Sequence, residues 1–114
     1  MPPMPEFDDV LQRLAALISV RRREPTGPSY TRELLDAGVE RCARKLGEET
    51  TETIIAALGN DKQALTREAA DLLYHLLVLL ESKQVTFNDV LAELHARMGQ
   101  SGLAEKAARR NPSS

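Results

Sequence analysis

Residues 45–71 read KLGEETTETIIAALGNDKQALTREAAD and predict the central element of the fold. Two runs of helix-favouring residues flank Gly59-Asn60-Asp61, a combination typical of a turn. We therefore predict one helix over Val39 to Leu58 and a second from about residue 61 to Ser82, packed antiparallel across the turn. Gly59 ends the first helix, and Asn60 or Asp61 caps the second.

Two pairs of carboxylates lie in this stretch, Glu49 with Glu52 and Glu68 with Asp71. A spacing of three residues points both members of a pair to the same side of a helix. If the helices pack antiparallel, the four acids converge and repel one another. Such a cluster makes physical sense around a hard cation that prefers oxygen ligands, so we predict a Mg2+ site.

The remaining segments also predict helices, which makes the chain an all-α bundle of four main helices plus a short C-terminal helix. The first should begin near Pro5-Glu6 and end at Arg21–Arg23, before a loop rich in proline and glycine. A short helical piece follows Ser29-Tyr-Thr31 and closes at Gly38. Thr86 caps the last main helix, which ends at Gly99 and carries an apolar stripe of Val90, Leu91, Leu94 and Met98. Residues 100–110 form a loop and a short basic helix.

Apolar residues define the faces that these helices should bury. Cys42 is expected to be a small buried residue on one apolar face of the helix at 39–58, together with Val39, Ala43, Leu46, Thr50, Thr53, Ile54 and Ala57. The helix after the turn is leucine-rich on more than one face between Leu72 and Leu80. A bundle centre or a dimer interface explains this, and we expect a homodimer that completes the site across its interface.

Composition limits the class of protein. At 114 residues with a net charge of −2, the chain should be a single domain over 1–114 with frayed ends at about 1–4 and 111–114. The charge argues against nucleic-acid binding, although Arg21–Arg23 is either a solvated helix end or a local contact. A single cysteine, no signal peptide and no long apolar run predict a cytoplasmic protein that does not enter a membrane.

The acidic motif also carries a resemblance. Glu48-Glu49-x-x-Glu52 followed by Glu68-x-x-Asp71 resembles the EExxE…ExxD signature of the all-α nucleoside triphosphate pyrophosphohydrolases, the MazG-like superfamily. Four segments are similar to one family within it, the phosphoribosyl-ATP pyrophosphohydrolases of histidine biosynthesis: 29–31, 45–49, 70–77 and 99–106. The resemblance implies hydrolysis of 1-(5-phosphoribosyl)-ATP to 1-(5-phosphoribosyl)-AMP and pyrophosphate. It also implies that Glu49, Glu52, Glu68 and Asp71 hold Mg2+.

Other polar residues leave alternatives open. Glu48 orients a ligand or the attacking water, or it faces solvent. Lys45 contacts the polyphosphate, or it balances the charge of Glu49 four residues on. His75 shares the flank of the second acid pair and either supports the ligands or packs structurally. Lys106, with Arg109 and Arg110, either closes over phosphates or lies on a solvated helix.

Two other functions fit parts of the pattern. A related enzyme that cleaves dUTP or another nucleotide would keep the acids without needing the segment at 99–106. A non-catalytic helical dimer would carry the acids as surface charge, and divalent ions would then leave its stability unchanged.

Overall fold

The computed structural model describes residues 9–24 and 29–99, and within these ranges it contains five α-helices and no strand. The helices are α1 (Val10–Arg23), α2 (Tyr30–Ala37), α3 (Val39–Leu58), α4 (Lys62–Ser82) and α5 (Phe87–Gly99). The all-α prediction is confirmed. None of the described helices is long and apolar enough to cross a bilayer.

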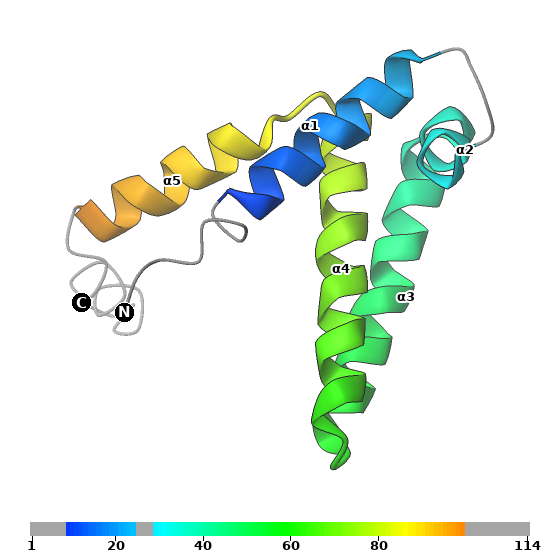
Figure 1. Cartoon of the computed structure of the whole chain (residues 1–114), viewed down its shortest axis with the longest axis vertical. Coiled ribbons are helices and arrows are strands. Elements are labelled where there is room, and N and C mark those ends of the chain that lie inside the picture. Colours follow the sequence, from blue (N-terminus) through cyan, green and yellow to red (C-terminus); the bar gives the residue numbers. More distant parts are fainter. Residues whose placement is uncertain (1–8, 25–28, 100–114) are drawn as a thin grey trace, which may run out of the picture.

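The centre of the fold is the antiparallel hairpin of α3 and α4 (Figure 1). Gly59 ends α3, but its φ of −90° lies outside the left-handed region. Asp61 caps α4, because its carboxylate accepts hydrogen bonds from the main-chain N–H groups of Gln63 and Ala64 at 3.0 and 3.1 Å. Of the two predicted caps, Asp61 is therefore the one used.

The ends of α2 also follow the predicted signals. Ser29 caps the helix by accepting the main-chain N–H of Arg32. Gly38 closes it with a φ of +105°, a conformation that side-chain-bearing residues rarely adopt. This glycine lets the chain turn directly from α2 into α3, which places α2 against the top of the hairpin (Figure 1).

The core lies where α1, α2, α3 and α4 meet. Its buried apolar residues are Ile18, Leu34, Cys42, Leu77 and Val78. Cys42 is buried as predicted, and its thiol donates to the carbonyl oxygen of Leu34 at 3.3 Å. Across the top, Arg22 of α1 pairs with Glu81 of α4 at 2.6 Å, so this part of the arginine run serves an internal contact.

The apolar segment of α4 is covered largely within the chain, as expected for a bundle centre. Between Leu72 and Leu80, Leu73 is 39% exposed and the other leucines are half-buried or buried. The predicted face of α3 is wrong at both ends, because Val39 and Ala43 are exposed near its start and Ile54 and Ala57 at its far end. In the described part of the chain, the far half of α3 lies beside α4 alone (Figure 1), and one helix cannot cover both sides of the other.

Two predictions about the outer helices need correction. The first helix begins at Val10, because Asp9 has a φ of +55° and does not continue the helix backwards. Thr86 caps α5 as predicted, accepting the N–H of Asp89. However, α5 contains no buried residue, and its expected apolar stripe leaves Leu94 and Met98 exposed. The short basic helix expected after Gly99 lies outside the described residues.

Candidate metal centre

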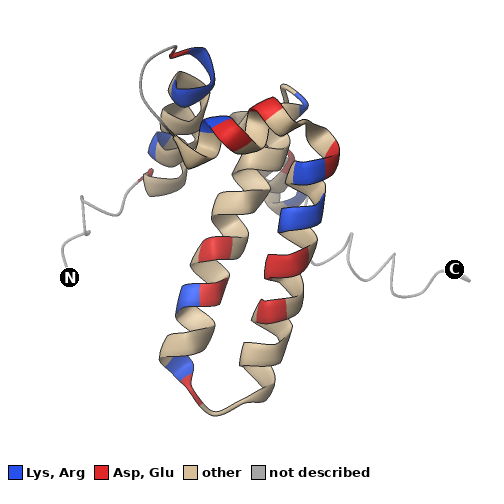
Figure 2. Cartoon of the chain, turned by 90° about the vertical axis from the view of Figure 1, so that its right-hand side faces the viewer, with Lys and Arg blue, Asp and Glu red and all other residues tan. Residues whose placement is uncertain are grey.

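The acidic side chains of α3 and α4 gather near the middle of the hairpin. Glu49 from α3 and Glu68 with Asp71 from α4 each offer a carboxylate oxygen, and these oxygens lie within 4.8 Å of one another. Figure 2 shows the acidic bands of the two helices facing each other at this level. Glu49 and Glu68 are half-buried, whereas Asp71 is exposed. Antiparallel packing therefore brings together one acid from the first pair and both from the second.

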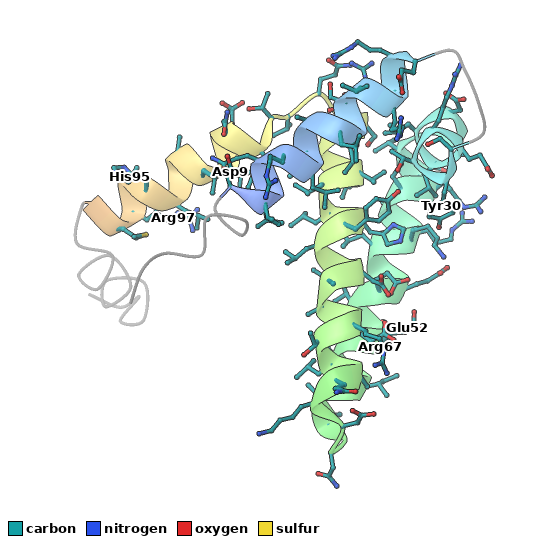
Figure 3. The ribbon with its side chains drawn as sticks, viewed as in Figure 1. Asp9, Tyr30, Glu52, Arg67, His95 and Arg97 are labelled. Atoms are coloured by element: carbon teal, nitrogen blue, oxygen red, sulfur yellow. The ribbon has the colours of Figure 1, made fainter. Side chains whose placement is uncertain are left out.

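Glu52 takes a different place from the one expected. It is exposed on α3 and stays outside the group of three converging oxygens. In Figure 3 it lies on the same flank of the hairpin as Arg67. Its charge still acts on the cluster: burial raises the pKa of Glu49, and the charges of Glu52, Asp71 and Glu68 raise it further.

This cluster suits a hard divalent cation. Three carboxylates supply oxygen ligands, and the raised pKa of Glu49 shows that their charges oppose one another without a cation. Mg2+ prefers carboxylate oxygens and keeps several waters, so it needs few protein ligands and an open side. Neither cysteine nor histidine belongs to the group, which disfavours softer metals such as zinc.

Thr53 connects the two helices at the level of the acids, a contact that helical periodicity did not predict. Its hydroxyl lies 2.7 Å from the carbonyl oxygen of Glu49 and 3.1 Å from that of Glu68. The first bond is local to α3, while the second crosses to α4. One half-buried hydroxyl thus ties together the main chains that carry two of the acids.

Lys45 and Glu48 form an ion pair on the same flank. The Lys45 ammonium lies 3.1 Å from a Glu48 carboxylate oxygen, so its partner is Glu48 rather than Glu49 as one reading assumed. The hydrogen bond to Glu48 raises the pKa of Lys45, with smaller contributions from Tyr30 and Glu49. Lys45 thus stays cationic between the acids and α2.

His75 is buried one turn beyond Asp71 on α4 and lies among aromatic rings. Only 5% of it is exposed, and its ring centroid lies 4.9 Å from that of Tyr74 and 6.1 Å from that of Tyr30. Burial lowers its pKa, and so does the nearby charge of Lys45. Its Nδ1 has no hydrogen-bond partner within the described residues. His75 therefore packs beside the acids without bonding to them.

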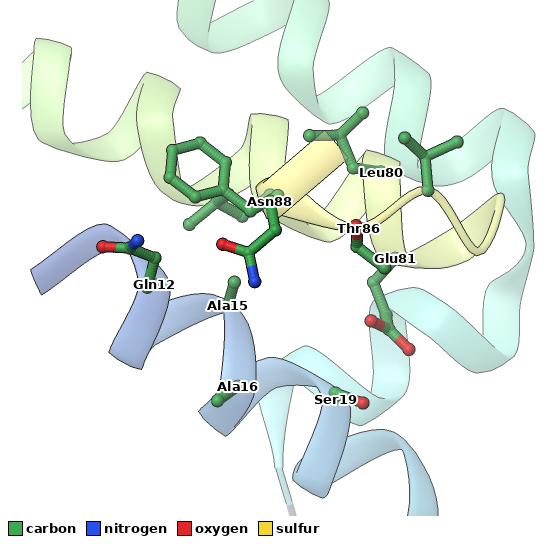
Figure 4. Close-up of a pocket in the computed structure, with 11 residues that line it drawn as sticks. Gln12, Ala15, Ala16, Ser19, Leu80, Glu81, Thr86 and Asn88 are labelled. Atoms are coloured by element: carbon green, nitrogen blue, oxygen red, sulfur yellow. The ribbon is translucent and has the colours of Figure 1, made fainter. Parts of the chain in front are cut away.

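A cavity of about 220 Å3 lies elsewhere, between α1, the end of α4 and the start of α5 (Figure 4). Its lining includes Gln12, Ser19, Glu81 and Phe87, and none of the cluster acids takes part. The acids lie apart from this cavity, between α3 and α4, where Glu49 and Glu68 are half-buried and Asp71 is exposed.

Comparison with known proteins identifies the family. The family model described as phosphoribosyl-ATP pyrophosphohydrolase matches residues 11–98. The chain belongs to the phosphoribosyl-ATP pyrophosphohydrolase family. A phosphoribosyl-ATP pyrophosphatase from Novosphingobium aromaticivorans is 51% identical over 106 residues, covering 93% of this chain and 99% of the relative. Relatives with the same name from Azorhizobium caulinodans and a Jannaschia species are 51% and 52% identical, covering 93% and 87% of this chain and 97% of each relative.

Membership of the phosphoribosyl-ATP pyrophosphohydrolase family confirms the predicted resemblance, the all-α MazG-like fold and a hydrolase activity. The matched range contains both helices of the hairpin and every acid of the motif. It ends before Lys106, which also lies outside the described residues, so the proposed role of Lys106 at phosphates stays a prediction. The residues that sequence reasoning overlooked are Thr53 and the aromatic pair Tyr30 and Tyr74.

Proposed function

We propose that this member of the phosphoribosyl-ATP pyrophosphohydrolase family hydrolyses 1-(5-phosphoribosyl)-ATP between its α and β phosphates. Water adds across the anhydride, the bridging P–O bond breaks, and 1-(5-phosphoribosyl)-AMP and pyrophosphate leave. The observation that carries the proposal is the convergence of Glu49, Glu68 and Asp71 within 4.8 Å in a chain of this family. The reaction is the second step of histidine biosynthesis.

The proposed cofactor is Mg2+, which Glu49, Glu68 and Asp71 would hold. Mg2+ binds phosphate oxygens and offsets their charge during hydrolysis. Glu52 adds negative charge beside Glu49 and strengthens the attraction for a cation. Thr53 keeps the two helices in the register that the acids require.

Lys45 is the candidate for direct contact with the polyphosphate. It pairs with Glu48 one turn before Glu49 on α3, and its ammonium is available as a point charge beside the acids. Glu48 is 51% exposed and holds Lys45 at 3.1 Å, so we assign it the positioning of this cation. The alternative role of Glu48, orienting the attacking water, stays a prediction.

We also propose a homodimer, based on a different surface from the leucine segment that first suggested one. Ile54, Ile55 and Leu58 are 57%, 62% and 83% exposed at the far end of α3. Within the described residues, the far half of the hairpin contains no fully buried side chain. Two helices that share so little core need further apolar cover, and a second copy of the hairpin would provide it. The cytoplasmic location stays a prediction.

The decisive experiment measures pyrophosphate release from 1-(5-phosphoribosyl)-ATP with and without Mg2+, with dUTP and ATP assayed in parallel. We expect release that depends on Mg2+ and on the phosphoribosyl group. Release from dUTP instead would keep the metal site and change the substrate. No release from any of the three would favour the non-catalytic dimer.

A further inference from the structure

Tyr30 is an exposed aromatic residue in the first turn of α2, next to the acidic flank of the hairpin. It remains 49% exposed, and Figure 3 shows it on the side of the hairpin that also carries Glu52 and Arg67. The ring nevertheless packs against two neighbouring rings, those of Tyr74 and His75. Its centroid lies 6.5 Å from that of Tyr74 at an interplanar angle of 19°, and 6.1 Å from that of His75 at 90°.

The residues on either side of Tyr30 form hydrogen bonds within the fold, whereas Tyr30 makes ring contacts alone. Ser29 caps α2, and the Thr31 hydroxyl shares a hydrogen bond with the hydroxyl of Tyr74. That hydrogen bond holds Tyr74 in place, and the ring of Tyr74 in turn stacks against Tyr30. The Tyr30 hydroxyl has no hydrogen-bond partner within the described residues, and about half of the residue is exposed there. The ring is thus supported by Tyr74 and His75 and keeps an exposed surface.

The position of Tyr30 relative to the acids suggests a ligand. His75 follows Asp71 by four residues, which is about 6 Å along a helix, and Tyr30 packs against the edge of His75. Lys45 precedes Glu49 by four residues on α3, about 6 Å along the helix toward α2, and its ammonium lies 3.1 Å from a Glu48 carboxylate oxygen. The order along the flank is therefore aromatic ring, cation, carboxylates. A nucleotide whose phosphates lie at Lys45 and the carboxylates would place its base toward Tyr30.

We propose that Tyr30 is the base-binding residue of this site and stacks on the purine ring of the nucleotide substrate, with Tyr74 and His75 supporting it. The inference rests on the proposed function, because it takes the substrate to be a purine nucleotide whose phosphates lie at the acids. Stacking of a base on an aromatic side chain changes affinity by roughly ten- to a hundredfold.

The test compares Tyr30→Leu with Tyr30→Phe. Tyr30→Leu removes the aromatic ring, and we expect the KM for 1-(5-phosphoribosyl)-ATP to rise roughly ten- to a hundredfold, more than kcat falls. The Kd of the product 1-(5-phosphoribosyl)-AMP, measured by calorimetry, should weaken to the same extent. Tyr30→Phe retains the ring and should recover most of the affinity. Inhibition by pyrophosphate, which has no base, should be the same in all three proteins.

Val39→Ala serves as a matched control, because Val39 is also a half-exposed apolar residue at the start of a helix near α2. It should change neither KM nor Kd. The proposal is overturned if Tyr30→Leu leaves both constants unchanged, or if it weakens pyrophosphate as much as the nucleotide. A wild-type protein that binds no 1-(5-phosphoribosyl)-AMP also overturns it. A protein that binds this nucleotide but releases no pyrophosphate refutes the proposed function alone, so the two failures are distinguishable.

Discussion

The hydroxyl of Thr53 on α3 lies 3.1 Å from the main-chain carbonyl oxygen of Glu68 on α4. The same hydroxyl lies 2.7 Å from the main-chain carbonyl oxygen of Glu49 on α3. Thr53 therefore contacts the main chain at two residues whose side chains belong to the acidic cluster. We therefore expect the register of the hairpin, and with it the spacing of the acids, to depend in part on a side chain outside the acidic cluster.

Replacing Thr53 by valine tests this dependence. Valine keeps the shape but removes the hydroxyl, so we expect a loss of about 1 kcal/mol in the free energy of unfolding and a weaker Kd for Mg2+ as the acids lose register. Thr50→Val is the matched control, since its hydroxyl is also half-buried but bonds only within α3, to Leu46. Thermal melts with a Mg2+ titration compare the two. Equal Mg2+ affinity in both variants would show that Thr53 is not needed for the site.

Removing a charge from the cluster should stabilise the protein without metal. Burial and three neighbouring acids raise the pKa of Glu49, which means that its ionised form is unfavourable in the folded state. Above this raised pKa we therefore expect Glu49→Gln to increase Tm in the absence of Mg2+. The same variant should lose the stabilisation by Mg2+ and at least about a hundredfold in kcat/KM. Glu40→Gln, in the first turn of the same helix, should lower Tm slightly.

A Tm of Glu49→Gln below that of the wild type without Mg2+ would contradict the repulsion argument. Chelator should be present in that measurement, because bound Mg2+ reverses the sign for the wild type. Differential scanning calorimetry with and without added Mg2+ gives both numbers on the same samples.

The lowered pKa of His75 predicts that the free energy of unfolding depends on pH. Burial lowers its pKa below the ordinary value of 6.5, and the Lys45 charge adds to this, while Asp71 and Glu48 act in the opposite direction. Between the lowered pKa and 6.5 the unfolded chain binds more protons than the folded one. The free energy of unfolding should therefore rise with pH across this window and become level above it.

The measurement is urea unfolding of the wild type and His75→Phe between pH 5 and 8 in the presence of chelator. The difference between the two proteins isolates His75 from Glu49, whose raised pKa gives the opposite slope at lower pH. Phenylalanine also removes the unpaired Nδ1, so we expect the variant to be within about 1 kcal/mol of the wild type at pH 7. A pH-independent difference would show that His75 titrates normally.

The proposed dimer predicts that a charge at the far end of α3 separates the subunits. Leu58 is 83% exposed in the single chain, so Leu58→Glu should cost the monomer little. In the dimer the same carboxylate would be buried without a partner. We expect sedimentation velocity to show a dimeric wild type and a largely monomeric variant. Met98→Glu, at the exposed end of α5, is the control for a charge placed on another apolar site. A monomeric wild type would contradict the proposed homodimer.

The helices could be predicted from the amino-acid sequence, because the signals for their ends and faces are local. Asp61, Ser29 and Thr86 cap helices at the predicted positions, and the turn at 59–61 joins the two longest ones. Helical spacing also placed Glu68 and Asp71 on one side of α4, and the acidic motif indicated the family that the comparisons then showed. Each of these inferences needs only a few consecutive residues.

Which side chains meet between helices could not be predicted without the packed structure. The spacing of Glu49 and Glu52 is the same as that of Glu68 and Asp71, yet Glu52 remains outside the three converging oxygens. Helical periodicity gives the direction of a side chain around its own axis, but not the rotation and height of one helix against another. Those quantities depend on packing and on contacts such as that of Thr53 with Glu68, which join residues 15 positions apart in the chain.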